Sequence, residues 1–145
     1  MRLTIFAISL MLTSSIAKAE TKMIDLDQVP TKRVHNSADV RPIAVTSAGV
    51  PSLVILEVNK GIVVPPHATQ SGLRLLTVLS GNMSWGDGDE VQMGRETIYP
   101  AGSHLLLRSG DMHWLAARSE DLRIQMVLLH DQKLTPPVAK QVAYP

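Results

Sequence analysis

The chain has 145 residues, 45% hydrophobic but only 3% aromatic, so a single core built mainly from Leu, Val and Ile is expected. Its formal net charge is +1, and no cluster of Lys and Arg mixed with aromatic residues occurs, which argues against nucleic acid as a partner. The absence of cysteine excludes disulfides, thiolate catalysis and metal sites that depend on cysteine.

Residues 1–19 have the pattern of a secretory signal peptide. Arg2 precedes an apolar run at 3–12, and Ala17-Lys18-Ala19 has the form of a cleavage site. The apolar run is shorter than the roughly 20 residues needed to span a bilayer. We therefore expect a periplasmic or secreted protein that begins near Glu20 and has no membrane contact after cleavage. Removing Arg2 and Lys18 takes the net charge from +1 (14 basic, 13 acidic) to −1 (12 basic, 13 acidic).

Residues 20–52 are expected to form an N-terminal arm with edge strands. Pro30, Pro42 and Pro51 punctuate short apolar stretches such as 43–45. Proline cannot donate to a strand ladder and is confined to sheet edges and turns.

From residue 53 onward, short apolar runs alternate with turn signals, and no helical period is present. Pro65 and Pro66 are expected to end the strand that begins at Ile62. The run 73–79 carries a single charge, Arg74, which suits a strand buried on both faces. We predict strands at 53–58, 62–64, 73–79, 83–85, 96–99, 104–107, 114–117 and 122–129. This pattern predicts an all-β sandwich or barrel over 53–135, followed by a loosely held extension at 136–145.

Two glycine-bounded segments each supply a histidine. The first contains Gly61, His67 and Gly81, and the second contains Gly102, Gly110 and His113. This spacing resembles the paired signature motifs of the cupin superfamily, and especially its small single-domain members. The resemblance covers residues 61–113 and implies a double-stranded β-helix, which is a jelly-roll barrel. It also implies a homodimer.

In a typical cupin, two histidines and a glutamate of the first motif and one histidine of the second hold Fe, Mn, Ni, Cu or Zn. The resemblance assigns His67 and His113 to the first and fourth ligand positions. Thr69 stands where the second histidine would be, and Arg74 stands where the glutamate would be. A guanidinium stays protonated and cannot coordinate a metal, so the site is expected to be weak or absent. Thr69, His104 and Gln125 are candidate additional donors if their side chains point inward.

Two functions follow from this pattern. In the first, the protein binds a small molecule in the barrel, and Arg74, if it faces inward, favours a carboxylate or phosphate on that molecule. In the second, the protein is a metal-dependent cupin enzyme of the dioxygenase or isomerase type that uses His67 and His113. Fold alone does not decide between them, so the second function rests on analogy. We favour the first.

Other polar and aromatic residues are given structural interpretations. Trp85 and Trp114 are expected to pack in the core. The acidic residues at 87, 89 and 90 are interpreted as a solvated connection, because their spacing differs from that of a calcium-binding loop. His35 and His130 lie outside both motifs and are assigned no role.

Overall fold

The computed structural model describes residues 20–129 and 133–143. The expected signal peptide and His130 lie outside the described residues. Within these two ranges, no helix is both long enough and apolar enough to cross a bilayer.

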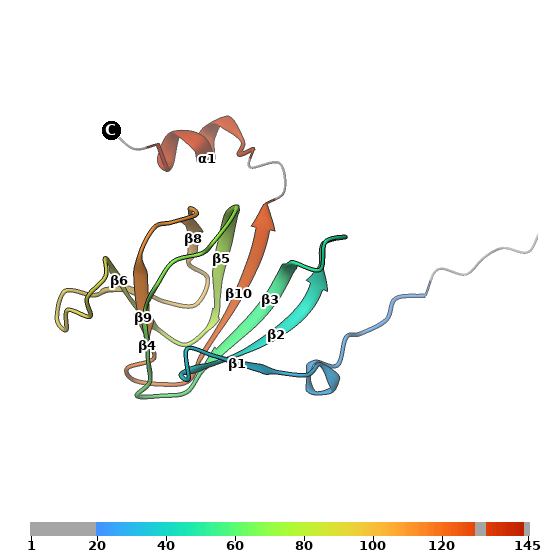
Figure 1. Cartoon of the computed structure of the whole chain (residues 1–145), viewed down its shortest axis with the longest axis horizontal. Helices are drawn as coiled ribbons and strands as arrows, with labels where there is room; N and C mark the ends of the chain where they lie inside the picture. Colours follow the sequence, from blue (N-terminus) through green and yellow to red (C-terminus); the bar gives the residue numbers. More distant parts are fainter. Residues whose placement is uncertain (1–19, 130–132, 144–145) are drawn as a thin grey trace, which may run out of the picture.

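The described chain is built almost entirely of strands (Figure 1). In chain order they are β1 (Lys32–Val34), β2 (Ala38–Val45), β3 (Pro51–Val58), β4 (Val63–His67), β5 (Leu73–Ser80), β6 (Met83–Asp87), β7 (Thr97–Tyr99), β8 (His104–Leu107), β9 (His113–Ala116) and β10 (Leu122–Leu129). A short 3₁₀ helix (Leu26–Gln28) precedes them, and the helix α1 (Pro136–Gln141) follows. The expected all-β fold is therefore confirmed.

The strands form two antiparallel sheets. The larger has the order β1-β2-β3-β10-β5-β8, and the smaller has the order β4-β9-β6-β7. Most neighbouring strands are distant in sequence, as in a jelly roll, where the chain crosses repeatedly from one sheet to the other. Only the β1–β2, β2–β3 and β6–β7 pairs join consecutive strands.

The inner faces of the two sheets enclose one hydrophobic core. Leu76, Val78 and Ile124 come from the larger sheet, while Met83 and Leu115 come from the smaller one. Each of these side chains is at least 98% buried. Because successive residues in a strand point to opposite faces, these core residues show which face of every strand is inward.

Strand β4 differs from its prediction. It runs through Pro65 and Pro66 to His67, whereas the prolines were expected to end it. The strand tolerates them because it forms the edge of its sheet and its pairing with β9 is irregular between Val64 and His67. This extension is what brings His67 into the sheet.

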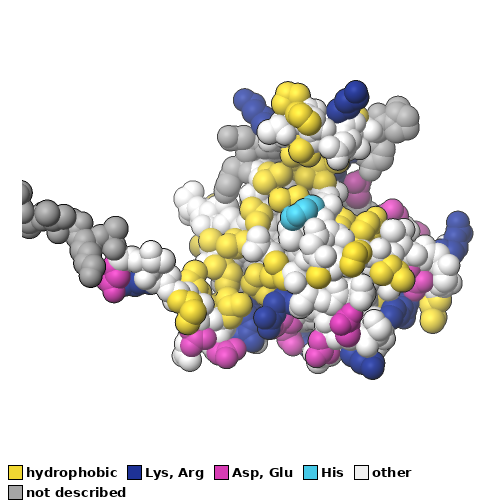
Figure 2. All heavy atoms as spheres, turned by 180° about the vertical axis from the view of Figure 1, so that it is seen from behind, with side chains coloured by type: hydrophobic (Ala, Val, Ile, Leu, Met, Phe, Trp, Pro, Cys, Tyr) yellow, Lys and Arg dark blue, Asp and Glu magenta, His cyan; other side chains and the backbone are white. Residues whose placement is uncertain are grey.

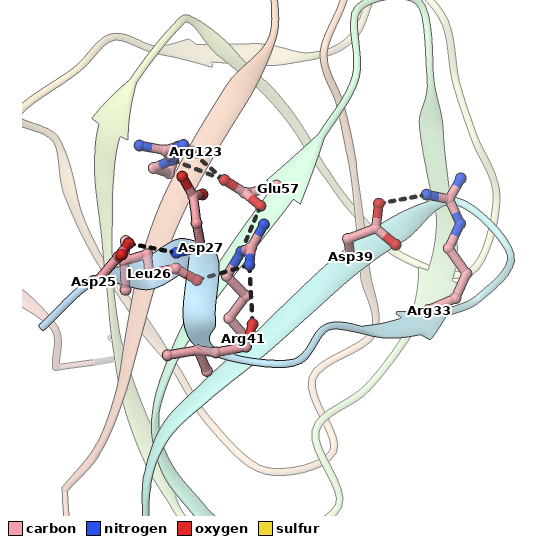
Figure 3. A network of polar contacts seen from close by, with 9 residues as sticks. Asp25, Leu26, Asp27, Arg33, Asp39, Arg41, Glu57 and Arg123 are labelled. Carbon is pink, nitrogen blue, oxygen red and sulfur yellow. Dashed lines mark hydrogen bonds and ion pairs between the residues drawn. The ribbon is translucent and has the colours of Figure 1, made fainter.

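The N-terminal arm is fixed to the outer face of the larger sheet by a charged network (Figure 3). Arg41 on β2 donates to the carbonyls of Leu26 and Val29 at 2.8 and 2.9 Å and to Glu57 at 3.0 Å. Glu57 also accepts two hydrogen bonds from Arg123 on β10. The chain before β1 is therefore held by backbone carbonyls as well as by charge.

Helix α1 is an element that the sequence analysis did not predict. It has only six residues, too few to show a helical period, and it begins with two prolines, which are tolerated in the first helical turn. Arg108 donates to the carbonyl of Val142 at 2.8 Å and so ties the end of this helix to the barrel. Figure 1 shows α1 across the end of the barrel at which β10 finishes.

Seen from behind, the molecule has a broad region of hydrophobic side chains below this helix (Figure 2). Acidic and basic side chains gather along the opposite edge of the same face. The outward positions of β5 and β10 include the half-buried Leu75 and Val127 and the exposed Leu79, which agrees with an apolar outer surface.

Two glycines with the same backbone conformation provide a test of the fold. Gly61 and Gly81 have φ of +83° and +82°, but a Cβ would meet nothing within 4 Å at Gly61, whereas at Gly81 it would lie 2.5 Å from the Asp121 carbonyl oxygen. Both Ala substitutions impose left-handed strain of roughly 1–3 kcal/mol. We expect Gly81→Ala to lose clearly more unfolding free energy than Gly61→Ala in urea titrations. Equal losses would contradict the close approach of the turn after β5 to the turn before β10.

Candidate functional site

The site is organised by strand β9, which lies between β4 and β6. In the register of these strands, His113 on β9 is directly opposite His67 on β4 and Asp87 on β6. Residues directly opposite each other in a sheet project from the same face. His113 is two residues from the core residue Leu115, so all three side chains are on the inward face.

A continuous row of rings crosses this inward face. The centroids of the His67 and His113 rings are 4.5 Å apart, and the indole of Trp85 stacks on His113 at 4.6 Å with an interplanar angle of 10°. The row continues on the other side, because the His35 ring is 4.4 Å from that of His67. The structure therefore gathers three imidazoles and one indole.

Backbone carbonyls fix the orientation of two of these imidazoles. The Nδ1 of His67 donates to the Pro65 carbonyl at 2.8 Å, and the Nδ1 of His113 donates to the Asp111 carbonyl at 2.9 Å. A carbonyl oxygen can only accept, so Nδ1 carries the proton in each ring. In the neutral rings, Nε2 therefore keeps its lone pair, which can accept a hydrogen bond or coordinate a cation.

The surroundings keep both rings in this neutral form. Burial lowers the pKa of His67 from its ordinary value of 6.5, and the nearby His113 and His35 rings lower it further. Burial also lowers the pKa of His113, against opposing contributions from the Asp111 carbonyl and the Asp87 carboxylate. At neutral pH the pair acts as an acceptor of hydrogen bonds rather than as a cation.

His35 is the member of the row that the sequence analysis missed. It lies in the three-residue connection between β1 and β2, where His35 and Asn36 have φ of 50° and 54°. The Ser37 N–H donates to the Val34 carbonyl at 3.0 Å and closes a turn with these two residues at its centre. Asn36 gives a local signal for the turn, but nothing near residue 35 in the sequence points to residue 67.

Arg74 is on the inward face of β5, and its guanidinium reaches the start of β3. It alternates with the core residues Leu76 and Val78 on β5, so its side chain starts from the inside of the barrel. Its one hydrogen bond among the described residues is a long one, 3.5 Å, to the Pro51 carbonyl at the start of β3. Burial lowers the pKa of its guanidinium. None of the ion pairs in ranges 20–129 and 133–143 involves Arg74.

Thr69 ties together the two loops that carry the motifs. Its hydroxyl donates to the Arg108 carbonyl at 3.2 Å, and its own carbonyl accepts from the Gly110 N–H at 3.0 Å. The hydroxyl thus connects the loop after β4 to the loop before β9. Because the hydroxyl donates its proton to the Arg108 carbonyl, only its oxygen lone pairs remain to contact another group.

His104 and Gln125 are on the outer face of the larger sheet, so the structure does not bring them to the imidazole row. Gln125 is directly opposite Thr77, and Thr77 is directly opposite His104. These positions alternate with inward Leu76 and Ile124. The His104 ring is hydrogen-bonded to the Thr77 hydroxyl at 3.0 Å.

The donor set does not fit a transition metal ion. Within the described ranges, no group of three or more His, Asp or Glu side chains is arranged to hold one. His67 and His113 present two oriented nitrogens, but the third imidazole, His35, lies against His67 ring to ring. Arg74, a cation, stands at the position where the resemblance to cupins would place a glutamate. We therefore derive no chemistry through a metal.

Comparison with known proteins gives structural likeness only. No protein-family model matches the sequence, and no curated protein matches it. A predicted oxalate decarboxylase of Thermotoga maritima is 16% identical over 74% of this chain and 100% of its own, with a TM-score of 0.57. The polyketide cyclase RemF of Streptomyces resistomycificus is 19% identical over 75% of this chain and 79% of its own, with a TM-score of 0.58. A cupin 2 conserved barrel domain protein of Leptotrichia buccalis is 21% identical over 68% of this chain and 43% of its own, with a TM-score of 0.50.

The lowered pKa values of His67 and His113 predict how stability depends on pH. Above pH 6.5 the rings are neutral in both the folded and the unfolded chain, so their contribution to stability is complete. Below 6.5 the unfolded chain takes up protons that the folded chain still resists, and stability falls. We expect the unfolding free energy to drop as the pH falls from about 6.5 towards about 5.5, a range above most carboxylate titrations. The double variant His67→Gln, His113→Gln should show a shallower slope in urea titrations, and parallel slopes would contradict this assignment.

Proposed function

We propose that this chain, which has the double-stranded β-helix fold of the cupins, is an exported protein that binds a small anionic molecule in its barrel. In this proposal Arg74 anchors the anion, and His67, His113 and Thr69 contribute to the lining. Export rests on the signal-peptide pattern at residues 1–19. An intact mass for the periplasmic form that still includes those residues would remove this part of the proposal.

The observation that supports an anionic ligand is the state of Arg74. The Arg74 side chain projects from the inner face of β5 and is partly buried. Its guanidinium pairs with no carboxylate in the described part of the chain. Burial removes part of the hydration of this cation and lowers its pKa. A carboxylate or phosphate would restore the missing charge pair, and the planar fork of donors suits its two oxygens.

The imidazole row supports a polar ligand rather than a purely apolar one. The Nε2 atoms of His67 and His113 are on the inner face with their lone pairs available, because both Nδ1 atoms are engaged by carbonyls. Acceptors that face the inside of a barrel can be satisfied by water or by a donor of a bound molecule. A hydroxyl or amide of a bound molecule would supply one.

A substitution at Arg74 tests the anchor. We expect Arg74→Gln to weaken the binding of inorganic phosphate or succinate by at least about tenfold, the scale of a charged hydrogen bond worth 1.5–3 kcal/mol. Arg74→Lys should recover part of the loss, since it restores the charge without the fork. Binding is measured by NMR titration at constant ionic strength.

The matched control for that experiment is Arg95→Gln. Arg95 is an exposed arginine whose side chain donates to Gln92 Oε1 at 2.9 Å. Its loss should leave phosphate and succinate affinity unchanged. If Arg74→Gln and Arg95→Gln behave alike, Arg74 does not anchor either anion.

The second candidate function is a metal-dependent enzyme, and one observation favours it. Carbonyl-anchored Nδ1 atoms with Nε2 lone pairs on the inner face are typical of histidines that bind metals. Such a site would use His67 and His113 with a divalent transition metal, and it would need donors that the described arrangement does not supply.

Elemental analysis separates the two functions. We expect protein purified without chelators to carry less than one equivalent of Fe, Mn, Ni, Cu or Zn, and brief dialysis against EDTA to remove it, because two imidazoles hold such ions weakly. The double variant His67→Ala, His113→Ala is the comparison. One ion per chain that resists EDTA and is absent from this variant would favour the enzyme.

A further inference from the structure

Arg74 and the two oriented imidazoles come from the same end of the barrel but from different sheets. His67 is the last residue of β4 and His113 is the first residue of β9, while Arg74 is the second residue of β5. The loops that lead into β5 and β9 are tied together by Thr69. Arg74 belongs to the larger sheet and both histidines belong to the smaller one. A ligand anchored at Arg74 therefore meets the imidazoles across the interior of the barrel.

The free nitrogen atoms of these imidazoles are open to a ligand. In His67 and His113, Nδ1 is engaged by a backbone carbonyl, and Nε2 has no hydrogen-bond partner in the described part of the chain. Among the described residues, the Ser37 hydroxyl is the one side-chain polar atom that is buried without a partner. The two Nε2 atoms must therefore keep access to solvent, although the rings themselves are largely buried.

The two sheets present polar groups of different kinds to the interior. Arg74 offers hydrogen-bond donors and a positive charge, whereas the Nε2 atoms of the neutral His67 and His113 rings can only accept. Asp87, directly opposite His113, adds a carboxylate and therefore further acceptors. A ligand with a second negative charge would meet only acceptors on the smaller sheet. A ligand with an apolar body would displace water from these acceptors without replacing its hydrogen bonds.

Of the groups that could donate to these acceptors, hydroxyl groups fit best. Burial lowers the pKa of both rings, and at His67 the neighbouring His113 and His35 rings lower it further. The same surroundings disfavour an ammonium group, because it would bring another positive charge there. An amide would bring a carbonyl oxygen that finds no donor among these acceptors. The centroids of the His67 and His113 rings are 4.5 Å apart, so the ligand needs two donors side by side.

We propose that the ligand of this barrel is a hydroxy acid, a monocarboxylate whose carbon chain carries neighbouring hydroxyl groups. Its carboxylate is held by Arg74, and two of its hydroxyl groups donate to Nε2 of His67 and Nε2 of His113. The inference rests on the anion site of the proposed function and adds the chemical class of the ligand. A site built to receive hydroxyl groups discriminates against an analogue that lacks them, because its acceptors are then left unpaired.

Three monocarboxylates of six carbons test this class: gluconate carries hydroxyl groups, hexanoate carries none, and 6-aminohexanoate carries an ammonium group instead. Binding is followed in ¹H–¹⁵N spectra at constant ionic strength and at about pH 7.5, where the imidazoles are neutral. The indole signal of Trp85 is the readout, because this ring stacks on His113, and Trp114 on the other face of the smaller sheet is the internal reference. We expect gluconate to bind at least about tenfold more tightly than either of the other acids.

A variant of one imidazole connects this preference to the acceptors. His67→Phe keeps a ring at the position but removes Nε2, so it should weaken gluconate binding by about three- to tenfold and lower the preference for gluconate over hexanoate. The matched control is His104→Phe, which removes an exposed imidazole on the outer face of the larger sheet. Its affinity for gluconate should equal that of the parent chain.

The parent chain alone can overturn the inference, so the test does not depend on the folding of a variant. The inference fails if gluconate causes no saturable shift of the Trp85 signal, or if hexanoate or 6-aminohexanoate binds as tightly as gluconate. It also fails if His67→Phe and the parent chain bind gluconate equally well. The proposed function stands after any of these results if Arg74→Gln still weakens the binding of phosphate and succinate. Anion binding that is independent of Arg74 would remove both.

Discussion

The pairing of β9 with both β4 and β6 is the constraint on which the site depends. It places His67, His113 and Asp87 in one row across three strands, although these residues are at least 20 positions apart in the sequence. The core around Leu115 and Met83 fixes which face this row occupies, since a one-residue slip would turn all three side chains outward. The pairing register of β4, β9 and β6 therefore decides which side chains form the site, and the burial of the core residues fixes that register.

Much of the fold could be predicted from local sequence. The strands at 104–107 and 122–129 match prediction in full, and the others around the two motifs shift by a few residues at one or both ends, because turn-forming residues separate the apolar runs. The errors have physical causes: β4 continues through two prolines because an edge strand needs no donor there, and α1 is too short to show a period.

The site was less predictable, because the order of strands in each sheet decides which of its side chains lie next to one another. The alternation of Arg123 and Gln125 with Leu122 and Ile124 could have placed Gln125 outside, as the structure does. The run 73–79 offers no such guide, since both of its faces are apolar apart from Arg74 and Thr77, and only pairing with β10 shows that Arg74 is inward. His35 could not have been found at all without knowing that β1 and β4 are adjacent edges.

The turn that carries His35 is destabilised by its backbone conformation and by one buried hydroxyl, and this favours local opening of the hairpin. Two non-glycine residues with positive φ, and the Ser37 hydroxyl, buried without a hydrogen-bond partner in the described structure, each cost about 1 kcal/mol or more. Strand β1 has three residues and forms the edge of the larger sheet, where it pairs only with β2. This hairpin is therefore the segment of the larger sheet whose amide hydrogens should exchange with solvent soonest. Each such opening separates the His35 ring from the His67 ring and so shortens the row of rings by one member.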